Sequence, residues 1–156
     1  MRIRLIAAGT RMPDWVEAGF SDYAQRLPRE LRLELAEIPI PARGKNADIA
    51  RLREAEGEKM LKTAGPDARV IALDVRGRAL DTPELALAVK QWQQDGRDCC
   101  LLIGGPDGLS PACLARAESS WSLSRLTFPH ALVRVMVAEQ LYRAWSVLAG
   151  HPYHRA

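Results

Sequence analysis

Residues 101–110, LLIGGPDGLS, combine a short apolar run, a glycine-rich turn and the start of a helix. The three glycines of the turn lack a Cβ, so the backbone there can approach a flat ligand closely. Ser110 followed by Pro111 is typical of a helix cap and the first helical residue. The turn does not match the dinucleotide fingerprint G-x-G-x-x-G, and it lacks the Gly-Lys-Ser/Thr of a phosphate-binding loop. These residues alone fit either a ligand-binding loop or a plain strand-to-helix turn.

A second candidate segment, SLSRLTFPH at residues 122–130, is apolar but also carries Ser, Thr and Pro just before the expected final helix. This composition favours a pocket that presents backbone donors and acceptors between apolar side chains. An adenine ring requires that combination, because its faces are apolar and its edge carries hydrogen-bonding groups. A buried connecting segment without a ligand is the alternative that these residues leave open.

The chain ends in HPYHRA, residues 151–156, where two of its three histidines lie beside a tyrosine and an arginine. Arginine and an aromatic ring suit stacking on a nucleobase and contact with phosphate. A metal site is not expected, since no cysteine or carboxylate cluster joins these histidines. The alternative is a frayed terminus, which is common for the last few residues of a domain.

The composition is that of one ordinary globular domain, residues 1–156. Hydrophobic residues make up 47% of the chain and charged residues 26%, and the net charge is +3. This mild basicity fits a nucleic-acid partner without requiring one, because no block of like charges occurs.

The three cysteines, Cys99, Cys100 and Cys113, argue against a disulfide framework and against a zinc site, because their number is odd and no C-x-x-C spacing occurs. A reducing compartment follows from this cysteine usage. The apolar run at residues 5–8 is too short for a signal peptide, and no later run is long enough to span a bilayer. The sequence therefore predicts a soluble, cytoplasmic protein without a membrane partner.

Hydrophobic periodicity predicts an alternation of strands and helices. Strands are expected at residues 2–8, 31–38, 69–75, 98–104 and 120–124. Helices are expected at about residues 13–27, 47–63, 82–94 and 130–148, with a short one after Ser110. Such alternation is typical of a single α/β domain with a mainly parallel sheet and helices on both faces. Ligands bind beyond the carboxyl ends of such strands, which nominates the loops after Asp74, after Ile103 and between Ser122 and Pro129.

The expected final helix, residues 130–148, is apolar on nearly all sides. A helix of that kind must be buried all round, either inside its own chain or against a partner subunit. Glu139 and Arg143 stand four positions apart and can form an ion pair. We expect a symmetric dimer whose interface includes this helix, with burial inside a single chain as the alternative.

Several segments together resemble the ribosomal large-subunit methyltransferase H family, and they run through the whole chain in order. They are MPDWV (12–16), RGKNADI (43–49), LIGGPDGLS (102–110), SLSRLTFPHALVRV (122–135), EQLYRAW (139–145) and HPYHR (151–155). This bacterial family belongs to the SPOUT superfamily and methylates a pseudouridine of 23S rRNA. The resemblance implies S-adenosyl-L-methionine as the cofactor, a C-terminal trefoil knot in the α/β fold, 23S rRNA within the ribosome as the partner, and a homodimer.

The resemblance also implies which residues form the sites. The cofactor pocket is expected to include Leu73, Gly104, Leu123, Ser124, Arg125, Leu126, Thr127 and Phe128. The C-terminal segment of one subunit resembles a lid over the cofactor of the other, which makes Tyr153, His154 and Arg155 the expected catalytic residues. We interpret His154 as the proton acceptor, and Arg155 as the group that stabilises an anionic base or holds phosphate.

The implied reaction transfers a methyl group from a sulfonium to N3 of the pseudouridine base. N3 carries a proton, so the protein has to hold N3 in line and either remove that proton or stabilise the anion. No metal is needed, because the sulfonium already activates the methyl group. A ribosome-associated RNA-binding protein of the same fold without catalysis is the alternative function. A nucleotide-binding oxidoreductase is a weaker alternative, because the dinucleotide fingerprint is absent.

Overall fold

Strands and helices alternate along the chain in a computed structural model that describes residues 1–42 and 44–155. Arg43, in the RGKNADI segment, and Ala156, at the end of the sequence, lie outside the described residues. The strands are β1 (Arg2–Ala8), β2 (Arg32–Ile38), β3 (Arg69–Ala79), β4 (Cys99–Ile103) and β5 (Ser119–Ser122). The α-helices are α1 (Asp14–Arg26), α2 (Ile49–Ala64), α3 (Thr82–Asp95), α4 (Pro111–Arg116) and α5 (His130–Ala149). Two 3₁₀-helices, η1 (Arg29–Leu31) and η2 (Pro152–Arg155), complete the described elements.

The strands form one sheet with the order β2-β1-β4-β3-β5, and each of its pairings is parallel. The predicted α/β fold with a mainly parallel sheet is thereby confirmed. Parallel strands bring their carboxyl ends to the same edge of the sheet, which is where a ligand site is expected. The trefoil knot that the resemblance implies stays a prediction.

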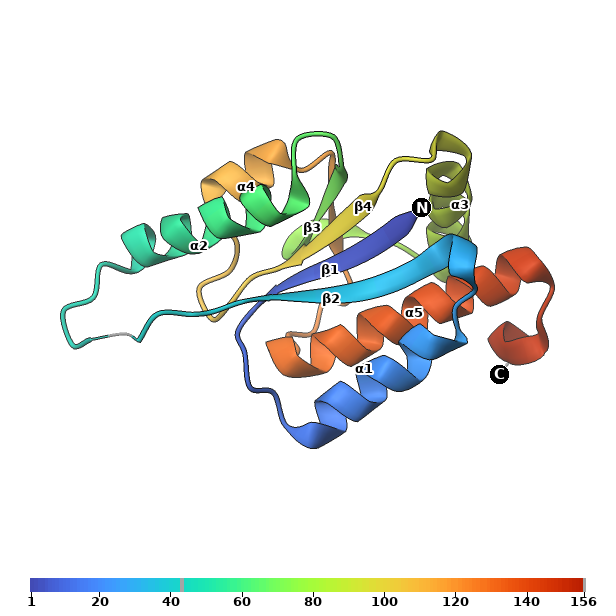
Figure 1. Ribbon diagram of the computed structural model, residues 1–156, viewed down its shortest axis with the longest axis horizontal. Coiled ribbons are helices and arrows are strands. Elements are labelled where there is room, and N and C mark those ends of the chain that lie inside the picture. Colours follow the sequence, from blue (N-terminus) through green and yellow to red (C-terminus); the bar gives the residue numbers. More distant parts are fainter. Residues whose placement is uncertain (43, 156) are drawn as a thin grey trace.

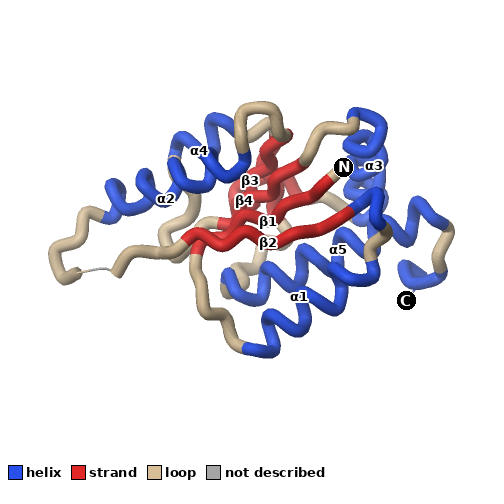
Figure 2. Tube along the Cα trace, viewed as in Figure 1, coloured by secondary structure: helices blue, strands red, loops and turns tan. Residues whose placement is uncertain are grey.

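Helices cover both faces of the sheet (Figures 1 and 2). One core cluster joins the sheet to α1, α3 and α5, and the other joins it to α2 and α4. Neighbouring residues of β4 point to opposite faces, so Leu101 belongs to the first cluster and Leu102 to the second. Because both faces of β4 are covered, its sequence CCLLI is apolar throughout and fully buried.

The helix boundaries follow from local signals in the sequence. Asp81 and Glu84 form a capping box at the start of α3, and Ser110 caps α4 by accepting a hydrogen bond from the backbone N–H of Cys113. Gly96 and Gly150 end α3 and α5 in the left-handed conformation that glycine adopts readily. These caps explain why the predicted helices agree closely with those observed.

Strand β3 is longer than predicted, because it continues past residue 75 to Ala79. Its pairing with β5 shifts register between Leu73 and Arg78, so that both residues lie opposite Trp121. A Cβ on Gly77 would lie only 2.6 Å from the carbonyl carbon of Ser120, so the close approach of the two strands requires glycine there. The strand was predicted to end at residue 75 because the apolar run ends there, before the irregular part of β3.

Among the helices of the described residues, none has both the length and the apolar character needed to cross a membrane.

Candidate functional site

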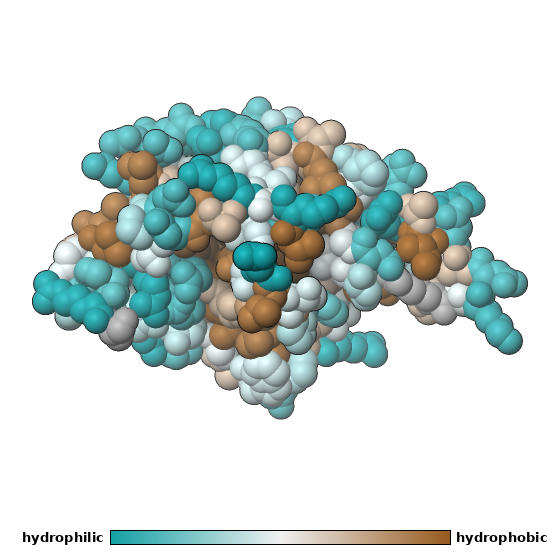
Figure 3. Space-filling model, turned by 180° about the vertical axis from the view of Figure 1, so that it is seen from behind, coloured by the Kyte–Doolittle hydropathy of each residue, from teal (hydrophilic) through white to brown (hydrophobic). Residues whose placement is uncertain are grey.

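A cavity of about 540 Å³ lies at the carboxyl ends of β4 and β5, beside the irregular middle of β3. Residues 73–76, 103–109, 121–124 and 126–130 form most of its lining, and Arg53 of α2 and Val133 of α5 complete it. These are the segments that the strand-end argument nominated from the sequence, although the residues after Asp74 continue β3 and do not form the expected loop. The volume falls within the range typical of small-molecule sites. Figure 3 views the molecule from behind and shows hydrophobic surface gathered near the middle of that side.

A larger depression, of about 760 Å³, lies between the end of α1 and the start of β2 and is lined by residues such as Phe20 and Arg29. It is at the amino ends of the strands, the opposite edge of the sheet from the nominated loops. Ligands of parallel α/β sheets bind at the carboxyl ends, so the smaller cavity is the stronger candidate.

The glycine loop, residues 104–109, folds back tightly on itself beside the cavity. The backbone N–H of Gly108 donates to the carbonyl oxygen of Gly105 at 3.0 Å, and Gly108 has a φ of +76°. A Cβ on Gly104 would lie 2.5 Å from the carbonyl carbon of Gly108, so only glycine fits there. The loop therefore exposes its backbone to the cavity at close range, which fits the first of the two alternatives that these residues left open.

The segment between β5 and α5 is held in a turn by its serines. The Ser122 hydroxyl donates to the carbonyl oxygen of Ser124 at 2.8 Å, and the Ser124 hydroxyl accepts from the backbone N–H of Leu126 at 3.0 Å. Leu126 is 71% exposed and Leu123 is 38% exposed, although both are apolar. These two leucines form an apolar wall at the cavity.

Charged groups also line the cavity. The Asp74 carboxylate accepts a hydrogen bond from the backbone N–H of Arg76 at 3.0 Å and pairs with its guanidinium at 3.5 Å. The guanidinium of Arg53 donates to the carbonyl oxygen of Asp107 at 3.4 Å. His130, the first residue of α5, lies at the same cavity. The site therefore combines apolar walls with hydrogen-bonding and ionic groups, as ligand pockets commonly do.

Seven of the eight residues expected at the cofactor pocket line this cavity: Leu73, Gly104, Leu123, Ser124, Leu126, Thr127 and Phe128. Arg125 is the exception, because it is exposed and is not among the described residues that form the lining. Sequence reasoning missed Arg53, whose position depends on packing between distant segments. It also missed Asp74 and His130 as lining residues, although a charged residue at the end of a buried strand was an available signal.

Residues 1–154 match the family described as predicted SPOUT methyltransferases. The chain belongs to this family. Two solved structures share the fold. A methylase family protein from Neisseria gonorrhoeae is 13% identical, with a TM-score of 0.55 over 90% of this chain and 81% of that one. A methylase family protein from Haemophilus influenzae Rd KW20 is 16% identical, with a TM-score of 0.55 over 97% of this chain and 69% of that one.

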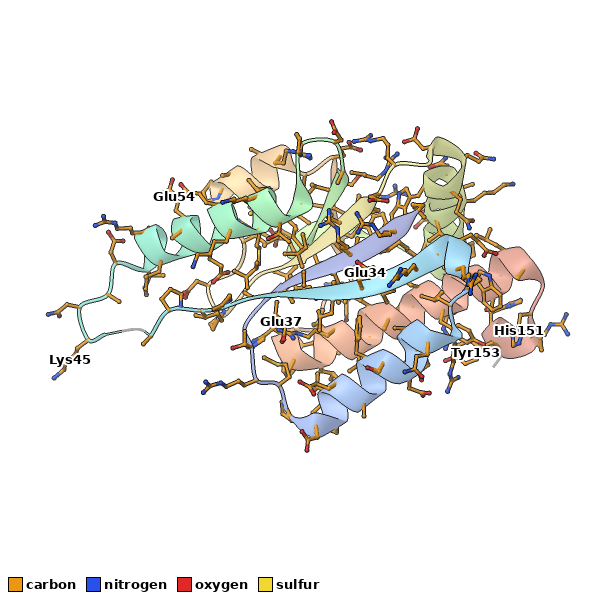
Figure 4. All side chains as sticks on the ribbon, in the orientation of Figure 1. Glu34, Glu37, Lys45, Glu54, His151 and Tyr153 are labelled. Carbon is orange, nitrogen blue, oxygen red and sulfur yellow. The ribbon has the colours of Figure 1, made fainter. Side chains whose placement is uncertain are left out.

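The expected catalytic residues of this SPOUT methyltransferase lie away from the cavity. Tyr153, His154 and Arg155 belong to η2, which packs on the C-terminal end of α5, whereas His130 at the start of α5 lines the cavity. Figure 4 shows Tyr153 alongside the second half of α5. None of the three is among the described residues that line the cavity. The segment folds back along α5, so that Tyr153 contacts Glu139 in the middle of the helix and His154 contacts Ser146. Ser146 lies 13 residues after Val133 of the cavity lining, so at 1.5 Å per residue roughly 20 Å of helix separates His154 from the cavity.

The C-terminal segment is ordered by contacts with α5. The Tyr153 hydroxyl donates to Glu139 at 2.9 Å, and Arg143 pairs with the same carboxylate oxygen, which confirms the predicted pair of Glu139 and Arg143. Burial, together with hydrogen bonds to Tyr23 and Glu139, raises the pKa of Tyr153 above its ordinary value. Tyr153 is therefore a neutral phenol that anchors the segment.

Proposed function

We propose that this SPOUT methyltransferase uses S-adenosylmethionine to methylate N3 of a pseudouridine in 23S rRNA, the reaction of the ribosomal large-subunit methyltransferase H family. Methyltransferases with this fold generally use that cofactor. The observation that carries the proposal is the convergence of three distant segments on one cavity. Those segments contain seven of the residues that the resemblance assigns to cofactor binding.

The lining of the cavity fits the chemistry of this cofactor. Leu73, Trp121 and Phe128 supply apolar surface for the faces of an adenine ring. The backbone of the serine-stabilised turn supplies donors and acceptors for its edge, and the carboxylate of Asp74 can accept from hydroxyl or ammonium groups. When bound, the cofactor supplies an activated methyl group, so the protein has to provide orientation and proton removal.

We further propose that the C-terminal segment acts on the cavity of a partner subunit in a homodimer. In its own chain none of the described residues of this segment lines the cavity, and His154 contacts Ser146 in the second half of α5. We assign proton removal to His154, whose Nδ1 lies 3.3 Å from the Ser146 hydroxyl, so that Nε2 would face the base. Arg155 is exposed and is assigned to the anionic base or to phosphate. Tyr153 keeps the segment in place.

The proposed function is tested by mapping the modified nucleotides of 23S rRNA by mass spectrometry. Ribosomes from a strain lacking the gene should have lost the methyl group of one pseudouridine. A plasmid carrying the wild-type gene should restore that methyl group, and one carrying Gly104→Ala should not. An unchanged methylation pattern in the deletion strain would rule out this substrate.

Calorimetry with S-adenosylhomocysteine, the demethylated product, separates the enzyme from the alternative function. The proposed methyltransferase should bind this ligand in a 1:1 ratio per chain. An RNA-binding protein that has kept only the fold has no use for it, so the absence of binding together with tight binding to ribosomes would favour the non-catalytic alternative.

A further inference from the structure

The glycine loop is supported on the side of helix α2 by a buried carboxylate. Glu56 of α2 is only 7% exposed, and its Oε1 accepts a hydrogen bond from the backbone N–H of Gly105 at 3.4 Å. Burial of a carboxylate costs free energy unless hydrogen bonds compensate for the lost water. Glu56 is not among the described residues that line the main cavity. It lies instead against a small gap behind the loop, together with Ile40 and Leu52.

The far end of the same loop also rests on α2. A Cβ on Gly57 would lie 2.2 Å from the hydroxyl oxygen and 2.9 Å from the Cβ of Ser110, so helix and loop approach as closely as glycine permits. Burial raises the pKa of the Cys113 thiol, which stays protonated and donates to the carbonyl oxygen of Gly57 at 3.6 Å. Ser110 in turn caps α4.

A third contact comes from the preceding turn of α2. Arg53 is three residues before Glu56, which places both on the same side of the helix. Its guanidinium reaches the carbonyl oxygen of Asp107 at 3.4 Å. Three residues of α2 thus contact the loop near its beginning, its middle and its end. Each of these contacts is made to the backbone or to a capping residue, so they fix the path of the loop.

We infer that Glu56 is a positioning residue of the cofactor site, acting through the N–H of Gly105 without touching the ligand itself. This inference rests on the proposed function, because it concerns how tightly the loop binds S-adenosylmethionine. Gly105 follows the end of β4 and pairs only with Gly108, in an isolated antiparallel bridge within the loop, and its N–H also donates to Glu56. A carboxylate supplies a charge-assisted acceptor in a place where an apolar side chain would supply none.

The experiment compares Glu56→Leu, Glu56→Gln and the matched control Glu54→Leu. Leucine keeps most of the volume of Glu56 but removes the acceptor, whereas glutamine retains an oxygen that can accept from Gly105. Glu54 is exposed on the side of the same helix that faces away from the sheet (Figure 4). Its substitution therefore reports on the general effect of replacing a glutamate of α2 by leucine.

Two measurements are made on each purified protein. Hydrogen exchange followed by mass spectrometry should show faster exchange in residues 104–109 of Glu56→Leu, with β4 unchanged. Calorimetry should show that Glu56→Leu binds S-adenosylhomocysteine about tenfold more weakly, as expected from the loss of one charge-assisted hydrogen bond. Glu56→Gln should stay within about threefold of the wild type, and Glu54→Leu should match the wild type in both measurements.

The inference is wrong if the loop of Glu56→Leu exchanges at the wild-type rate, or if Glu56→Gln is as defective as Glu56→Leu. If Glu56→Leu does not fold, Glu56→Asp is tested in its place. Aspartate keeps the charge, but its side chain is one methylene group shorter, which moves the carboxylate away from the N–H of Gly105. Glu56→Asp must then show faster hydrogen exchange in residues 104–109 with β4 unchanged, as expected for Glu56→Leu. A wild-type protein that fails to bind S-adenosylhomocysteine would refute the proposed function alone, since the exchange measurement does not use the ligand.

Discussion

Gly104 and Gly105 are neighbours, but a side chain would meet different surroundings at each position. A Cβ on Gly104 would lie 2.7 Å from the carbonyl oxygen of Gly108 and 2.8 Å from the backbone nitrogen of Leu109. A Cβ on Gly105 would instead face side chains, of which Cδ1 of Ile40 is the nearest at 3.2 Å. A side chain can rotate away from a new methyl group, whereas the backbone of the loop can move only if the loop opens.

We expect Gly104→Ala to weaken the binding of S-adenosylhomocysteine by at least about a thousandfold, or roughly 4.1 kcal/mol, which leaves its cavity inactive. Gly105→Ala should stay within about threefold of the wild type, because its methyl group would point toward Ile40. Calorimetry measures both affinities, and thermal melting checks that each variant is folded. Equal affinities for the two variants would show that the backbone crowding at Gly104 does not control the pocket.

Arg134 is a residue whose role the sequence alone does not reveal. It follows closely after the pocket-forming segment, yet its side chain is 1% exposed and does not line the cavity in the described part of the chain. The guanidinium pairs with Glu37 at 2.6 Å and donates to the carbonyl oxygen of Gly9 at 2.7 Å. Figure 4 shows Glu37 beside the start of α5. Arg134 therefore ties α5 to the ends of β1 and β2.

At the scale of the element, α5 is apolar all round for two separate reasons. Val137, Ala138 and Leu141 are buried in the core of their own chain. Leu132 and Met136 stand four positions apart on one side of the helix, are half-buried and do not belong to that cluster. Burial within the chain thus explains one side of the helix, and the proposed dimer would cover the other.

Substitution of two adjacent residues of α5 distinguishes these two sides. Val137→Glu would bury a charge in the core and should destabilise the fold by about 4 kcal/mol or more. Met136→Glu should leave the melting temperature close to that of the wild type but shift the proposed dimer toward monomer. Circular dichroism measures the first effect, and light scattering at several concentrations measures the second.

A Met136→Glu protein that remains dimeric would show that this side of α5 lies outside the interface. If light scattering shows that the wild type is a monomer at all concentrations tested, the dimer itself is wrong.

The elements were predictable from sequence because their signals are local. The capping box at Asp81 and the glycine after α3 mark helix ends within a few residues, and the apolar run of β4 reflects two covered faces. The remaining features depend on contacts between distant segments. Glu56 and Gly105 are 49 residues apart, and no local pattern relates them. The same reason explains why Arg53 was missed at the cavity and why Arg125 was expected there.

At the scale of the whole molecule, the cavity lies at the start of α5, whereas the C-terminal segment packs along the second half of that helix. Tyr153 is anchored to Glu139 and His154 contacts Ser146, so His154 cannot reach the cavity of its own chain without breaking these contacts and crossing roughly 20 Å. A second copy of the chain can bring a C-terminal segment to the cavity while both subunits keep their observed structure. The proposed homodimer is therefore a requirement of the mechanism assigned to His154 and Arg155.

A mixed dimer tests this requirement. One chain lacks residues 152–156 but keeps its cavity, and the other carries Gly104→Ala but keeps its C-terminal segment. If the segment acts on the partner's cavity, the mixed dimer has one complete site and should show about half of the wild-type methylation rate, since the two sites act independently. If the segment acts within its own chain, both sites are broken and no activity returns. Each homodimer of the two variants serves as the inactive control. Full activity of the truncated homodimer would remove His154 and Arg155 from the mechanism altogether.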